Sequence, residues 1–302
     1  MEQSRPIKLL RDFAAVFVTG IFMFPLFWWA LTSIKPMSEI FNKDKVVVFD
    51  FVPTAINYVV TLLGRSRADL AIDQGIGMGV AGSGAFDSRQ TIVDSMIISL
   101  GATAVSITIA VTAAYALSRM AFKGRNLFLN WVLGQRLMPP IAILIPLVTI
   151  YKFAGLRDTD NLYMGYLGLI LIYALINLPI AVLLLKSFFD DVPKDIDEAA
   201  MIDGATRWQT FQKIVLPMVK GGVAAAAVLC FIFSYTEFLL SLFLTTDIRT
   251  LPVKISTFVT STGSEWGFIS ALGTAGIVPS FIFILLVQRH LVRGLTLGSL
   301  KE

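Results

Sequence analysis

The sequence is poor in the residue types that most enzymes use for catalysis and for metal binding. Its 302 residues include a single histidine, His290, and a single cysteine, Cys230. Zinc sites draw three or four ligands from cysteine, histidine and carboxylate side chains, and neither paired cysteines nor an H-E-x-x-H sequence occurs. One cysteine cannot form a disulfide within the chain. The composition therefore gives no support for hydrolytic or redox chemistry.

Nucleotide binding by this chain has no support either. The sequence contains no G-x-x-x-x-G-K-[ST] phosphate-binding loop. Residues 77–82, GMGVAG, match the dinucleotide pattern G-x-G-x-x-G. That pattern binds pyrophosphate when it lies between a buried strand and the start of a helix, and neither is evident here. We interpret the glycine-rich stretch 73–86 as part of a long loop.

Charged residues are scarce, and apolar ones are abundant. The chain is 56% hydrophobic and 15% charged, with a mean hydropathy of +0.75. Soluble domains are about 45–50% apolar and about 25% charged. The apolar residues also lie in long runs, which is typical of an integral membrane protein.

Six apolar segments are long enough to cross a bilayer, which takes about 20 residues in a helix. Prolines and two polar residues interrupt the third segment, and the fifth contains Glu237. No series of alternating ten-residue segments indicates membrane-spanning strands. The sequence therefore predicts an all-α polytopic membrane protein with six transmembrane helices. The segments are residues 13–34, 95–117, 127–151, 162–185, 221–244 and 267–287.

The basic residues predict the orientation of these spans. On one side of the predicted spans lie the N-terminal tail, residues 118–126, residues 186–220 and the C-terminal tail, which carry 14 Lys and Arg in about 70 residues. The segments on the opposite side carry 10 in about 90. Six of those 10 lie in one long loop, 35–94, where they count weakly. Because cytoplasmic loops are enriched in Lys and Arg, we expect both termini to be cytoplasmic and this loop to face outward.

Between the fourth and fifth spans lies a polar passage, residues 193–217, whose pattern is typical of two short helices. Pro193 suits the first turn of a helix, and Gly204 suits a left-handed C-terminal position. Thr206 and Gln209 have the spacing of a capping box. A solvated connector is the alternative interpretation, but a connector needs neither these caps nor adjacent alanines. We expect the passage to dock onto a cytoplasmic partner.

The same passage resembles the "EAA" signature of permease subunits of ATP-binding-cassette (ABC) importers. In that family it forms the coupling helix, which sits in a cleft of the ATPase subunit. The resemblance therefore assigns coupling to the matching positions. They are Glu198, Ala199, Ala200, Gly204, Ile214, Leu216 and Pro217.

Other motifs resemble the carbohydrate-importer permeases of the maltose-transporter type, in particular the second of their two permease subunits. They are TLPV (250–253), EWG (265–267), FSYTEFLLSL (233–242) and QRHLVRGLTLGSLK (288–301). The resemblance covers roughly residues 95–302 and implies the type I importer, or MetI-like, fold. It divides the chain into 1–94, with the first helix and the long loop, and a core permease domain, 95–302.

The resemblance also implies partners. We expect a similar but different second permease, two ATPase subunits that bind ATP and Mg, and an extracytoplasmic binding protein. This chain would bind no cofactor and no metal, and it would not itself be an enzyme.

Polar residues inside the predicted spans are candidates for the translocation path, because such groups are costly in lipid and face a cavity or another helix. For Arg136 and Glu237, a structural role that ties helices together is an equal or better alternative. The candidates are Gln135, Arg136, Asn177, Tyr235 and Glu237.

We therefore expect an importer permease that works by alternating access on a sugar, a sugar derivative or a polyol. The alternatives are an ABC permease for amino acids, peptides or anions, a secondary transporter, and a structural membrane scaffold. A secondary transporter usually shows internal repeats and a midplane ion site, and neither is evident. The sequence does not choose between glycerol, a disaccharide and a phosphorylated polyol.

Overall fold

The computed structural model describes residues 5–41, 50–65, 87–135, 137–159, 161–260 and 263–298. Arg136 and the glycine-rich stretch 73–86 lie outside these ranges. The chain divides into two compact units. One comprises Met1–Gln90 and Lys254–Ile277, and the other comprises Thr91–Val253 and Val278–Glu302.

The first unit is built around α1 (Arg5–Ser33), the first predicted span. In the apolar 18-residue stretch of this helix, only 6% of the residues are buried within the protein, as expected for a helix surrounded by lipid or by another subunit. The Asn57 side-chain amide donates to the carbonyls of Ser33 and Lys35, both at 2.9 Å, and so fixes the end of α1. The unit also holds α2 (Met37–Ile40), α3 (Ile56–Leu63), α14 (Leu251–Ser256) in part, and the start of α15 (Trp266–Gly298).

A short antiparallel ladder also belongs to this unit. It pairs β1 (Val259–Thr260) with β2 (Gly263–Ser264) in the register Val259 to Ser264. The described part of the chain is otherwise helical or irregular.

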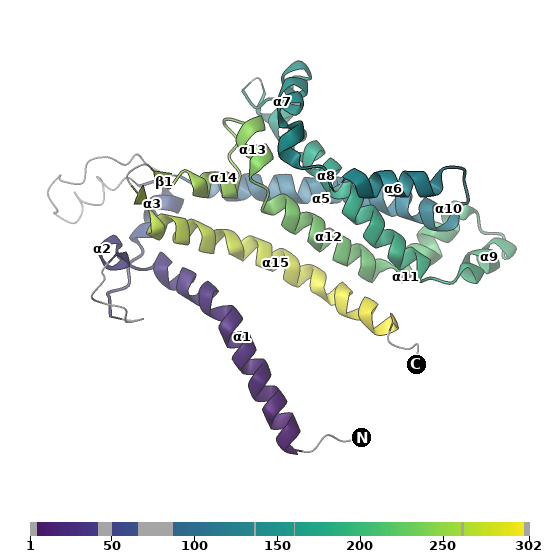
Figure 1. The fold of residues 1–302 in the computed structure, drawn as a ribbon, viewed down its shortest axis with the longest axis horizontal. Coiled ribbons are helices and arrows are strands. Elements are labelled where there is room, and N and C mark those ends of the chain that lie inside the picture. Colours follow the sequence, from purple (N-terminus) through teal and green to yellow (C-terminus); the bar gives the residue numbers. More distant parts are fainter. Residues whose placement is uncertain are drawn as a thin grey trace. The chain divides into compact units, whose positions relative to one another are not determined.

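Three long helices run side by side in the second unit (Figure 1). Their close packing depends on small residues. A Cβ on Gly222 of α12 would lie 2.3 Å from the Phe188 ring of α8, so only glycine fits. The Ser106 hydroxyl of α5 also donates to the Ala174 carbonyl of α8 at 3.2 Å, a contact typical of membrane helices. The helices are α5 (Arg89–Arg119), α8 (Leu162–Asp190) and α12 (Lys220–Tyr235).

Shorter elements complete the second unit at the two ends of these helices. One buried apolar cluster joins α5, α8 and α12 to η2, and another joins α5 and α8 to α7 and α13. The shorter elements are α6 (Arg125–Gln135), η1 (Pro140–Ile143), α7 (Leu144–Phe153), α9 (Lys194–Ile202), α10 (Arg207–Thr210), η2 (Phe211–Val215), α11 (Leu216–Met218) and α13 (Leu239–Leu244).

The number of possible membrane crossings agrees with the sequence. Four helices in the described residues are long and apolar enough to cross a membrane, and two bent helix pairs raise the number to six. The predicted fold class, an all-α polytopic membrane protein, is confirmed.

Two of the predicted spans are not single straight helices. The third, 127–151, is divided between α6 and α7, whose pair is bent by 94°. Pro139 and Pro140 lie at this break, and proline cannot supply the backbone N–H of a continuous helix. The fifth, 221–244, breaks at 236–238 between α12 and α13. The break in the third span lies where the sequence predicted an interruption, whereas the break in the fifth was not predicted.

Candidate functional site

The polar passage folds into the elements α9 to α11, which we call the coupling segment (residues 193–217). Its first helix, α9, begins after Pro193, which occupies the N-cap position, one place earlier than predicted. Asp195 and Asp197 lie in the first turn, where the positive end of the helix dipole favours carboxylates. The passage is therefore structured from its first residue.

Gly204 ends α9 in the predicted left-handed conformation, with φ of 87°. The Gly204 N–H donates to the Met201 carbonyl at 3.1 Å, and the Ala205 N–H donates to the Ala200 carbonyl at 3.0 Å. These two bonds form a Schellman motif, which satisfies the last carbonyls of the helix. A Cβ added at Gly204 would meet nothing within 4 Å, so the requirement for glycine is conformational.

The next helix, α10, starts at the predicted capping box. The Thr206 N–H donates to Gln209 Oε1 at 2.8 Å, and the Gln209 N–H donates to Thr206 Oγ1 at 3.3 Å. The chain continues through the π-helical turn η2 into α11, where Pro217 precedes α12. The prediction of two capped helices with a sharp turn is confirmed.

The two alanines of the EAA signature differ in exposure. Glu198 and Ala199 are exposed, whereas Ala200 is 6% exposed and packs within the protein. Only Ala199 is therefore open to close approach by a partner, and the small side chain of Ala200 lets α9 lie close to its own chain. Further along, Ile214 and Leu216 are half-buried and Pro217 is exposed. The roles of all seven signature residues in coupling stay predictions.

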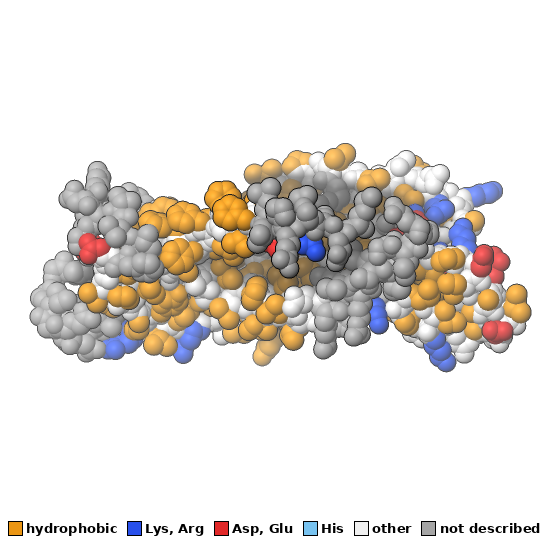
Figure 2. Space-filling model, turned by 90° about the horizontal axis from the view of Figure 1, so that it is seen from below, with side chains coloured by type: hydrophobic (Ala, Val, Ile, Leu, Met, Phe, Trp, Pro, Cys, Tyr) orange, Lys and Arg blue, Asp and Glu red, His pale blue; other side chains and the backbone are white. Residues whose placement is uncertain are grey.

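Two exposed apolar side chains on the coupling segment were not among the predicted site residues. Ile202, at the last turn of α9, is 87% exposed, and Trp208 of α10 is 57% exposed. Figure 2 shows orange apolar side chains among red and blue charged ones at its right-hand end, where this segment lies. Apolar residues inside an otherwise polar stretch are the signal in the sequence that could have identified them.

A groove of about 220 Å³ lies beside α9. Its rim carries both signs of charge, with Glu198 and Lys194 from α9 and Arg207 from α10, and Met201 adds an apolar contact. In the described residues, no hydrogen bond is made by the Glu198 carboxylate, which leaves it free for a cation or a helix N-terminus of another protein. The helices α9 and α10, which line this groove, also carry the exposed Ile202 and Trp208.

A buried ion pair attaches α9 to the end of α5. Arg119 Nε donates to Asp197 Oδ2 at 2.9 Å, and the two side chains are 8% and 10% exposed. The Tyr115 hydroxyl donates to the other carboxylate oxygen, Oδ1, at 3.0 Å. We call these three residues the α5–α9 clasp.

Asn177, a candidate for the translocation path, lies on α8 and contacts α12. Its side chain is buried, and its amide donates to Ser234 Oγ at 2.9 Å and to the Cys230 carbonyl at 3.4 Å. In this conformation the amide joins two helices. A role in the path stays a prediction.

The other path candidates lie in different places. Tyr235 is buried, with its ring stacked on Phe231 at a centroid distance of 5.4 Å, and Gln135 is exposed at the end of α6. The Glu237 carboxylate accepts the N–H groups of Leu240 and Ser241, so it caps the start of α13. This contact matches the structural alternative for Glu237. Arg136, the remaining candidate, lies outside the described residues.

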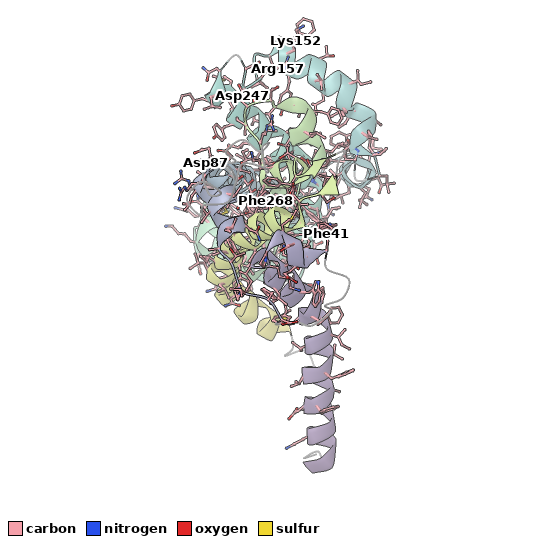
Figure 3. The ribbon with its side chains drawn as sticks, turned by 90° about the vertical axis from the view of Figure 1, so that its left-hand side faces the viewer. Phe41, Asp87, Lys152, Arg157, Asp247 and Phe268 are labelled. Carbon is pink, nitrogen blue, oxygen red and sulfur yellow. The ribbon has the colours of Figure 1, made fainter. Side chains whose placement is uncertain are left out.

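The end of the second unit opposite to α9 is also charged. Figure 3 looks onto that end, with Lys152, Arg157 and Asp247 labelled. There the buried Asp158 carboxylate accepts the N–H groups of Thr246, Asp247 and Ile248 at 2.6–3.1 Å. This contact joins the loop before α8 to the loop after α13. Long apolar helices with polar ends are the arrangement of a membrane-spanning bundle.

The fold and the coupling segment define an α-helical membrane protein with a structured docking element at one end of its bundle. The chain belongs to the family of binding-protein-dependent transport system inner membrane components, whose model matches residues 106–297. It is thus a multi-pass membrane permease, a transport subunit rather than an enzyme.

Similar proteins cover nearly the whole chain. It is 34% identical to the sulfoquinovosyl glycerol transport system permease protein SmoH of Agrobacterium fabrum, over 97% of this chain and 94% of that one. It is 38% identical to the trehalose/maltose transport system permease protein MalG of Thermococcus litoralis, over 97% of both chains. It is also 34% identical to the trehalose transport system permease protein SugB of Mycobacterium tuberculosis, over 94% of both.

A solved structure shows the same fold. It is the crystal structure of a bacterial ABC transporter involved in the import of the acidic polysaccharide alginate. One of its chains matches with a TM-score of 0.67 and 17% identity, over 96% of this chain and 99% of that one.

Proposed function

We propose that this permease carries a sugar, a sugar derivative or a polyol. The support is that the compounds in the names of its relatives are chemically alike. These compounds are sulfoquinovosyl glycerol, trehalose and trehalose/maltose. Each of these compounds is a glycoside rich in hydroxyl groups. A path for such cargo needs hydrogen-bonding side chains within apolar helices. Gln135, Asn177 and Tyr235 are the candidates in the described residues, since Glu237 caps α13.

The permease works in a complex of four kinds of subunit. Its partners are a second, different permease, two copies of an ATPase that holds ATP and Mg, and an extracytoplasmic binding protein. In this proposal both termini are cytoplasmic, and the support is the excess of basic residues at one set of span ends. The coupling segment then lies on the ATPase side of the membrane.

The single observation that carries the coupling role is the shape of this segment. Two capped helices present Glu198, Ala199 and the highly exposed Ile202 away from the protein. Exposed apolar groups with a polar rim are typical of a protein contact site. ATP-driven closure of the ATPase subunits moves the coupling segment, and the attached helices expose the path alternately to each side. Energetically, this is a difference in binding between two states.

Two experiments test the proposal. Purification of the tagged permease from its host should recover an ATPase and a second permease in the same complex. Calorimetry on the cognate binding protein should then show binding of trehalose, maltose or a related glycoside. Binding of amino acids or peptides with no response to sugars would contradict the cargo class, and recovery of the permease without an ATPase would contradict the assembly.

A further inference from the structure

The coupling helix α9 has little apolar surface with which to hold its own orientation. Of its nine residues, only Ile196 and Ala200 supply apolar side chains to the protein interior, and Ile196 is half-buried. Asp197 is the third inward-facing residue. A helix attached by so few contacts needs directional bonds to keep one face outward.

The α5–α9 clasp supplies those bonds. Both oxygens of Asp197 are held from α5, Oδ2 by Arg119 at 2.9 Å and Oδ1 by Tyr115 at 3.0 Å. Arg119 Nη2 also donates to the Val192 carbonyl at 2.9 Å, immediately before α9 begins. Arg119 therefore holds α9 at its first turn, through Asp197, and holds the turn between α8 and α9, through Val192.

A second contact holds the other side of that turn. The Ser118 hydroxyl donates to Asp190 Oδ1 at 2.6 Å at the end of α8, and Lys186 pairs with the same carboxylate. The Tyr115 ring packs against the Phe189 and Phe211 rings at centroid distances of 5.6 and 4.7 Å. The last turn of α5 thus contacts α8, α9 and η2 together.

The far end of α5 contacts elements at the opposite end of the unit. The Leu251 N–H donates to Ser95 Oγ at 2.6 Å, and the Tyr166 hydroxyl donates to Asp94 Oδ1 at 2.6 Å. With 31 residues, α5 is about 46 Å long at 1.5 Å per residue. A single helix therefore connects the end opposite to α9 with the coupling helix.

We propose that Arg119 is a positioning residue for coupling, which fixes the rotation of α9 on α5 through Asp197 and Val192. Asp197 and Glu198 are neighbours, and successive residues of a helix lie about 100° apart. Holding Asp197 inside therefore keeps Glu198, Ala199 and Ile202 outward. Because the clasp attaches α9 rigidly to α5, a movement of α5 also moves α9. This inference rests on the proposed role of α9 as the coupling helix.

A buried ion pair is a poor source of stability, since an apolar pair of similar volume often replaces it without loss. Its particular property is fixed geometry, because the planar guanidinium presents its N–H donors in fixed directions, here to Asp197 and to the Val192 carbonyl. Replacing the ion pair with an apolar pair can therefore distinguish a positioning role, which needs the directional bonds, from a structural role, which needs only the packing. The apolar pair Arg119→Met with Asp197→Leu should restore packing but lack the directional bonds.

The experiment uses the complete complex in lipid nanodiscs. ATP hydrolysis is measured with and without the extracytoplasmic binding protein, together with thermal stability and ATPase retention. We expect Arg119→Met alone to lose stability and the double variant to regain it. In both, stimulation by the binding protein should fall by about 2- to 30-fold, the range found for changes in coupled networks. Arg11→Met, which removes an exposed ion pair with Asp12 on α1 and touches no residue of the clasp, should keep wild-type stimulation.

Two results would overturn the proposal. One is a double variant that regains both stability and stimulation, because the clasp would then be a structural contact alone. The other is equal loss of stimulation in Arg11→Met. Ile202→Ser, in the same assay, tests the underlying role of α9. If Ile202→Ser loses the ATPase while the clasp variants behave as wild type, only the positioning role fails; if Ile202→Ser has no effect, the coupling role itself fails.

Discussion

Replacing Gly204 tests the geometry of the coupling segment without adding a steric clash. Its φ of 87° is left-handed, and a Cβ there meets nothing within 4 Å. The cost of a side chain is therefore that of the backbone conformation, about 1–2 kcal/mol for an ordinary L-residue. For a β-branched residue such as valine this conformation is a strong outlier. The Schellman turn that aims α10 should open in Gly204→Val.

The size of the effect on docking follows from that energy. When the binding-competent conformation of the coupling segment becomes less populated, the apparent affinity for the ATPase falls by the same factor. A penalty of about 1–2 kcal/mol corresponds to at most a 5- to 30-fold weaker association with the ATPase. Retention of the ATPase during purification and its coupled hydrolysis in nanodiscs measure this loss. The membrane helices are unaltered, so insertion should be normal.

Two control variants make the result specific. Gly124, between α5 and α6, has φ of 88° and equally open space, so Gly124→Val introduces the same strain away from α9. Asparagine tolerates left-handed backbone better than other residues, so Gly204→Asn should retain most of the coupling. Wild-type coupling in Gly204→Val, or equal losses in Gly124→Val, would refute the reasoning.

Three further predictions concern the contact surface, the path and the topology. Glu198→Gln should weaken a charge-assisted contact with the ATPase and lower coupled hydrolysis, and unchanged hydrolysis would remove this residue from the interface. Asn177→Leu should destabilise the permease by about 1–3 kcal/mol, read from thermal unfolding, through loss of its buried hydrogen bonds. Transport at limiting substrate should also fall with the ATPase still bound, and normal transport would exclude a place in the path. Cysteines placed at Ser83 and Thr206 should react with impermeant reagents from outside and from the cytoplasm, respectively. Labelling of position 83 from the cytoplasm alone would overturn the layout.

Features governed by neighbouring residues could be predicted from the sequence. The left-handed Gly204 and the capping box of Thr206 with Gln209 depend on chain chemistry within four residues. The apolar runs likewise predicted the helical membrane fold, because a spanning segment has to satisfy its own backbone hydrogen bonds.

Features governed by packing could not be predicted in the same way. Which alanine of the signature faces inward depends on Asp197, whose partner Arg119 lies 78 positions away in the sequence. The prolines at 139 and 140 indicated a break, but not a bend of 94°. The break at 236–238 contains neither proline nor glycine, and there the Glu237 carboxylate starts a new helix by accepting backbone N–H groups.

Site-specific crosslinking from the tip of α9 tests the central claim most directly. A photoreactive phenylalanine analogue at Ile202, which is 87% exposed, should crosslink to the ATPase subunit in the purified complex. The same analogue at Phe153, which is 86% exposed on α7, should not, because α7 lies at the opposite end of the unit. A crosslink to the ATPase from position 202 alone is the result that the coupling role predicts. An ATPase that stays bound but crosslinks from position 153 and not from position 202 would contradict it.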